Sequence, residues 1–70
     1  MNKNLSVFVI KDNEIKNEFH DLSQFLAYKI ATDHLYKDEQ IVSGVKVVIR
    51  DSEKIWFSAS NPVIKSVDII

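Results

Sequence analysis

Cysteine is absent from this sequence of 70 residues, and glycine and proline occur once each. The lack of cysteine excludes disulfides, cysteine-based zinc sites and thiol catalysis. Because small secreted domains usually depend on disulfides, a reducing, cytoplasmic location is expected. A single glycine is also too few for the glycine-rich loops that cradle phosphate groups.

An excess of charge of one sign is missing as well, because nine Lys and Arg residues stand against ten Asp and Glu residues, giving a formal net charge of −1. Domains whose main task is to hold nucleic-acid phosphates usually carry a clear positive excess. The first apolar run ends at Lys11 and is too short for a signal peptide or a membrane span. The composition therefore favours neither a nucleic-acid-binding nor a membrane protein.

The short length predicts one small domain, residues 1–70, built around a single core. Arg50 is the one arginine, whereas lysine, isoleucine and asparagine are frequent. This usage is typical of AT-rich genomes, such as those of low-GC bacteria and their phages, and it favours a phage or other mobile element as the source.

Five segments have the residue pattern of strands: 5–10, 15–19, 41–50, 54–60 and 63–70. The first is apolar on both faces, which predicts a central strand. The second follows the turn residues Asp12-Asn13 and alternates with charges, which predicts an edge strand. Turns are expected at 51–53 and 61–62. The lone Gly44, inside the third segment, predicts a bulge or a place where the helix packs close.

The helix signal lies between the second and third strands. Asp21 and Gln24 have the spacing of a capping box, and good helix formers continue to Tyr36 or Lys37. The predicted fold is α+β: a four- to five-stranded, mostly antiparallel sheet with the helix packed on one face. Its element order is strand, strand, helix, strand, strand, strand.

Catalytic and metal-binding patterns are not found. His20 precedes Asp21, and His34 follows Asp33. However, no motif links a serine or threonine nucleophile to either histidine. Nor do the two histidines have the spacing of a metal site. No catalytic residue, metal or cofactor is expected, and the chain is predicted not to be an enzyme.

A second apolar cluster on the helix is the first candidate for a binding surface. A helical wheel places Leu26, Ala27, Ile30, Ala31, His34 and Leu35 on one broad stripe. Leu22, Phe25 and Tyr36, with Lys29 between them, lie on another side. This cluster either caps the core at the helix ends or contacts another protein or a second copy of the chain, and Tyr and Phe are typical interface anchors.

The sheet face opposite the helix is the second candidate. Alternation places Lys46, Val48, Arg50 and Trp56 on this face, if Val45, Val47, Ile55 and Phe57 face the helix. Lys46, Arg50 and Trp56 could stack a base and touch phosphates, contact a protein, or simply be surface residues with ordinary cross-strand packing.

The resulting expectation is a non-enzymatic protein-interaction module, an inhibitor or accessory factor, whose partner is another protein or itself as a homodimer. The apolar last strand would be paired within the monomer or across that dimer. Two alternatives stay open: a nucleic-acid-binding module using the open sheet face, and a small subunit that completes an enzyme or complex.

Overall fold

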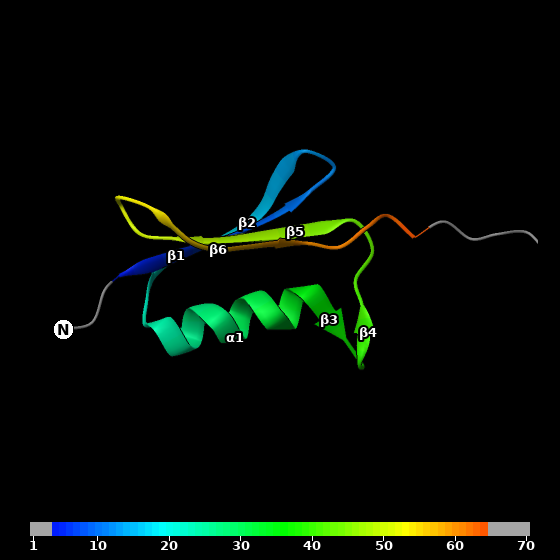
Figure 1. The fold of residues 1–70 in the computed structure, drawn as a ribbon, viewed down its shortest axis with the longest axis horizontal. Coiled ribbons are helices and arrows are strands. Elements are labelled where there is room, and N and C mark those ends of the chain that lie inside the picture. Colours follow the sequence, from blue (N-terminus) through cyan, green and yellow to red (C-terminus); the bar gives the residue numbers. More distant parts are fainter. Residues whose placement is uncertain (1–3, 65–70) are drawn as a thin grey trace, which may run out of the picture.

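A computed structural model describes residues 4–64, which form one helix and two β-sheets (Figure 1). The elements are β1 (Leu5–Lys11), β2 (Glu14–Leu22), α1 (Gln24–Leu35), β3 (Tyr36–Lys37), β4 (Gln40–Ile41), β5 (Val45–Arg50) and β6 (Ile55–Ser60). The main sheet has the order β2-β1-β5-β6, with every neighbouring pair antiparallel, and β3 and β4 form a separate two-stranded sheet. The predicted α+β class and the helix on one sheet face are confirmed.

The core lies between α1 and the two central strands, β1 and β5 (Figure 1). Alternate residues of these strands are buried under the helix: Leu5, Val7 and Val9 from β1, and Val45, Val47 and Ile49 from β5. The helix contributes Ala27, Ala31 and Leu35, and the two small alanines allow a close approach to the sheet. Each larger buried aliphatic side chain stabilises the fold by about 1.5–3 kcal/mol relative to an exposed position.

The β1–β2 hairpin turns at Asp12 and Asn13, as predicted. Both residues have positive φ angles, 56° and 61°, the combination that a two-residue hairpin turn with the twist of the flanking strands requires. Strand β2 extends further than the predicted 15–19 because its pairing with β1 continues to Leu22, which lies opposite Leu5.

The helix begins later than the capping-box pattern predicts, so that prediction is wrong. Ser23 is the N-cap, and its hydroxyl accepts a hydrogen bond from the backbone N–H of Leu26 at 3.3 Å. Asp21 instead belongs to β2, where it has a φ of 57°. Pairing of β2 with β1 up to Leu22 holds Asp21 within the strand, so the first available cap is Ser23.

The helix ends at Leu35 and is followed directly by a β3–β4 hairpin, which the sequence pattern does not predict. Tyr36 is extended, with a φ of −131°, and Asp38 and Glu39 make the turn with φ angles of 51° and 64°. The predicted strand 41–50 is therefore too long at its start, since Ile41 pairs with Tyr36 in the small sheet.

Gly44 lies in the turn that precedes β5, with a φ of 72°. A β-carbon at this position would stand 3.3 Å from Cγ2 of Val63. The left-handed backbone and the closeness of Val63 explain why this residue is a glycine. The predicted explanation, a bulge or a close contact with the helix, is wrong.

Asn61 joins the end of the helix to the sheet. Its side-chain Nδ2 donates to the carbonyl oxygens of Leu35 at 2.8 Å and Val42 at 3.0 Å. Its backbone N–H donates to the carbonyl of Val45 at 2.8 Å. The expected turn at Asn61-Pro62 therefore also anchors the segment between α1 and β5.

The β5–β6 turn is organised by Asp51. Its Oδ1 accepts from the backbone N–H groups of Glu53 and Lys54 at 2.7 and 2.8 Å, and its Oδ2 accepts from Nε1 of Trp56 at 2.7 Å. The predicted turn at 51–53 is confirmed. Of the predicted last strand 63–70, the part from 65 onward lies outside the described residues; Val63 and Ile64 are exposed and are not part of a strand.

Candidate functional site

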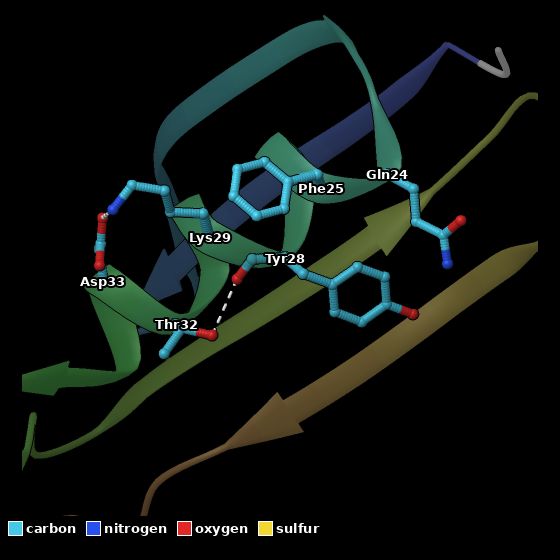
Figure 2. A pocket seen from close by; sticks show the side chains of 6 residues that line it. All are labelled: Gln24, Phe25, Tyr28, Lys29, Thr32 and Asp33. Atoms are coloured by element: carbon cyan, nitrogen blue, oxygen red, sulfur yellow. Dashed lines mark hydrogen bonds and ion pairs between the residues drawn. The ribbon is translucent and has the colours of Figure 1, made fainter.

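One flank of α1, whose Tyr28 ring packs on Phe57 of β6, forms a shallow hollow. Its volume is about 600 Å³. It is lined by Gln24, Phe25, Tyr28, Lys29, Thr32 and Asp33. Figure 2 shows these side chains along the helix, with Tyr28 reaching toward the β5 and β6 ribbons and Phe25 one turn earlier. We call this the α1–β6 surface, and we include Phe57 of β6, which contacts Tyr28.

Tyr28 connects the helix to the edge of the sheet. Its ring lies 5.5 Å from the ring of Phe57, centroid to centroid, at an interplanar angle of 53°. Both rings are partly buried and pack against the core. An aromatic side chain held in this way keeps little conformational freedom, so it is a rigid base for the more exposed residues around it.

Phe25 is the exposed member of the α1–β6 surface. Its side chain is 76% exposed, the highest exposure among the large hydrophobic residues that the structure describes. Beside it, Nζ of Lys29 and Oδ2 of Asp33 form an ion pair at 3.4 Å with both side chains mostly in solvent. Such a pair contributes little to stability, and it leaves a polar rim around the aromatic centre.

The predicted binding cluster on the helix is brought together only in part. Phe25 and Lys29 lie side by side on the α1–β6 surface. Leu22 instead ends β2 and packs against the core, and Tyr36 lies in β3 beyond the end of the helix. The clue to Tyr28, which the helical wheel did not single out, is its position three residues after Phe25 on the same flank.

The open sheet face differs from its predicted composition. Lys46 and Arg50 are exposed there as expected. A second hollow, of about 400 Å³, lies on this face beside Arg50 and is lined by residues of β1, β2 and β5. Its lining is mainly apolar: Phe8, Ile10, Ile15, Val48 and Arg50. This face therefore offers an apolar centre with two basic residues, rather than a basic surface.

Trp56 does not join Lys46 and Arg50 as predicted. A register shift in the β5–β6 pairing, between Ile49 and Arg50, leaves Trp56 as the extra residue of a bulge. Its ring packs against the core, and its Nε1 donates to Asp51. Lys46 lies opposite Ser60, at the other end of β6. The bulge changes the direction of the tryptophan side chain, which simple alternation cannot anticipate.

A polar cluster that the sequence pattern does not predict surrounds His20. The Oγ of Ser6 lies 2.9 Å from His20 Nδ1, and Oε1 of Glu18 lies 3.3 Å from His20 Nε2. The cluster combines a hydroxyl, an imidazole and a carboxylate. The cluster lies at a register shift of the β1–β2 pairing, between Leu5 and Val7. We interpret the cluster as cross-strand polar packing, with Phe8 against the imidazole.

His34 has a packing role at the end of the helix. Its Nδ1 lies 2.9 Å from the carbonyl oxygen of Ile30, and its ring lies 5.6 Å from that of Phe19 on β2. Within residues 4–64, no three His, Asp or Glu side chains gather closely enough to hold a metal ion.

No helix in the described part of the chain is long and apolar enough to cross a membrane. Comparisons with protein-family models, with curated proteins and with solved structures found no match to this chain.

Proposed function

We propose that this chain is a non-enzymatic protein-interaction module that binds a partner protein through its α1–β6 surface. The observation that carries the proposal is the high exposure of Phe25 next to the Tyr28–Phe57 pair. Isolated exposed hydrophobic residues are common on monomers, but Phe25 lines one hollow together with Tyr28, whose ring packs on Phe57, and with the charged side chains of Lys29 and Asp33.

The arrangement has the features of an interface centre. Aromatic side chains on a rigid element lose little entropy on binding and bury a large apolar area. Burial of the Phe25 ring by a partner would contribute about 1.5–3 kcal/mol. Lys29 and Asp33 at the rim would add orientation and specificity more than affinity.

The module would act by covering a surface of its partner, as an inhibitor or accessory factor in the cytoplasm. The absence of cysteine supports the location, and the small size together with the lysine-rich composition supports a phage or mobile-element origin.

Replacement of the exposed aromatic residue tests the proposal. Complexes of the tagged chain are isolated from its native host, the recovered protein is purified, and its affinity is measured by calorimetry. Phe25→Ala is expected to weaken binding at least about tenfold, because it removes the centre of the interface. Ile41→Ala is the matched control, since Ile41 is 40% exposed on β4 and lines neither of the two hollows.

Equal affinities of the Phe25→Ala and Ile41→Ala variants would overturn the proposal. Binding of nucleic acid gives a different result: affinity would fall steeply with salt and with Lys46→Glu or Arg50→Glu, and would not depend on Phe25.

A further inference from the structure

The two edges of the main sheet differ in how they are protected. Strand β2 carries Glu14, Lys16 and Glu18, and its pairing with β1 has two register shifts. Strand β6, at the other edge, has the sequence IWFSAS, without a charged residue or a proline. Charged side chains prevent another strand from adding to an edge, so β2 is protected. Strand β6 has one register shift, at Trp56, but from Phe57 to Ser60 it carries neither a charge nor an irregularity.

Among the described residues, 4–64, no strand pairs with the outer side of β6. Within residues 4–64, β5 is the strand that pairs with β6, and α1 lies over β1 and β5 (Figure 1). At alternate residues of an edge strand, the backbone N–H and C=O groups point away from the sheet. Another extended strand can form hydrogen bonds with all of these groups.

We propose that two copies of this chain pair through their β6 strands, antiparallel, to form one continuous eight-stranded sheet. A second copy fits this edge because β6 is complementary to itself: no charged side chain of one strand would face a like charge on the other. The functional meaning of this dimer rests on the proposed function, because pairing through β6 brings the α1–β6 surfaces of the two copies together.

Symmetry determines the geometry of this dimer. Antiparallel pairing of two identical edges requires a twofold axis perpendicular to the sheet, so both helices lie on the same face. Residues directly opposite each other must then belong to the same face. The bulge disturbs β6 at Trp56, so the regular part runs from Phe57 to Ser60. Centring the pair on Ser58 sets Phe57 opposite Ala59 of the other copy, a large side chain against a small one.

The dimer creates a groove between the two helices. Since α1 lies over β1 and β5, the two helix axes would be about four strand spacings apart, or about 19 Å. With a helix diameter of about 10 Å, a groove about 9 Å wide remains. Phe57 and Ala59 from both copies form its floor, and Phe25 and Tyr28 from both copies form its walls. Each copy therefore supplies half of the site for the partner protein.

Sedimentation of the full chain tests the association. At high micromolar concentration the wild-type protein is expected to sediment at twice its monomer mass of 8.1 kDa. Ser58→Lys places two lysines opposite each other at the twofold axis and is expected to give a monomer. Glu18→Lys is the matched control, because Glu18 is an exposed residue opposite Phe8 on the other edge strand, and it should remain dimeric. Circular dichroism confirms that each variant is folded.

Cysteine cross-linking tests the register. Because the chain has no cysteine, Ser58→Cys introduces a single thiol. In the proposed register the two Cα atoms lie about 4.5–5.5 Å apart, which a disulfide can span. Mild oxidation should convert most of the Ser58→Cys protein into a covalent dimer, whereas Glu18→Cys should stay largely monomeric. Equal cross-linking of the two variants would overturn the register.

The outcomes separate this inference from the proposed function. A monomeric wild-type protein, or a dimer that Ser58→Lys leaves intact, overturns pairing through β6 even if Phe25→Ala still abolishes partner binding. Conversely, a dimer that depends on Ser58 stands even if no partner depends on Phe25. If both hold, Ser58→Lys should also weaken partner binding about tenfold or more, because it separates the two halves of the groove.

Discussion

The side-chain amide of Asn61 joins segments that are far apart in the sequence. It donates to the carbonyl oxygens of Leu35 and Val42. Leu35 is the last residue of the helix, so its carbonyl has no hydrogen-bond donor within the helix. The same Leu35 carbonyl also accepts from the backbone N–H of Val42 at 2.8 Å. The sequence predicts only a turn at Asn61-Pro62, because hydrogen bonds across 26 and 19 positions leave no local pattern.

Replacement of Asn61 is expected to destabilise the fold. Asn61→Ala removes two donors from partly buried carbonyls and should lower the free energy of unfolding by about 1–3 kcal/mol. In a domain of this size that corresponds to a fall in melting temperature of about 4–8 °C per kcal/mol. Ser60→Ala, at the exposed neighbouring position, is the control and should have little effect. Equal melting temperatures for the two variants would show that these hydrogen bonds do not stabilise the protein.

At the scale of elements, the two flanks of α1 pack differently. The buried stripe of Ala27, Ala31 and Leu35 lies between them. One flank points to β2, where His34 meets Phe19, and the other points to β6, where Tyr28 meets Phe57. The helix therefore makes aromatic contacts on both flanks of its buried stripe, whereas Phe25 remains in solvent.

The start of α1 provides a test at this scale. Ser23→Ala removes the N-cap acceptor and should destabilise the protein by about 1 kcal/mol. Asp21→Gly should be neutral or stabilising, because Asp21 has a left-handed backbone that glycine adopts without strain. Urea unfolding of both variants measures the difference. If Asp21→Gly destabilised the protein more than Ser23→Ala, Asp21 would be the N-cap, which would contradict the observed start of the helix.

Local patterns predict the longer elements and miss the shortest ones. Alternation in 41–50 correctly selects Val45, Val47 and Ile49 as buried, since these residues share one face of β5. It also extends the strand back to Ile41, because a two-residue strand such as β4 is too short to have a period of its own. The turn at Asp38-Glu39 lacks the glycine or asparagine that usually marks such hairpins.

At the scale of the whole molecule, the candidate surface depends on strand order. The sequence predicts that Phe25 and Lys29 lie outside the core stripe, but the Tyr28–Phe57 contact on the same flank depends on the position of β6 next to β5 in the sheet. Which strand becomes an edge is decided by long-range pairing. The same pairing introduces the bulge that turns Trp56 toward the core and leaves the open face with an apolar centre.

The proposed dimer would make the stability of this small core depend on protein concentration. A chain of this length buries only about 60% of the surface exposed by its unfolded form, so its margin of stability is small. Dimerisation through β6 stabilises the folded state in proportion to the logarithm of protein concentration.

The melting temperature of the wild-type chain should therefore rise measurably over a hundredfold increase in concentration. The Ser58→Lys variant, which cannot pair, should melt at one temperature throughout that range, and at the lowest concentration the two proteins should converge. A wild-type melting temperature that does not change with concentration would mean that the monomer is the stable unit.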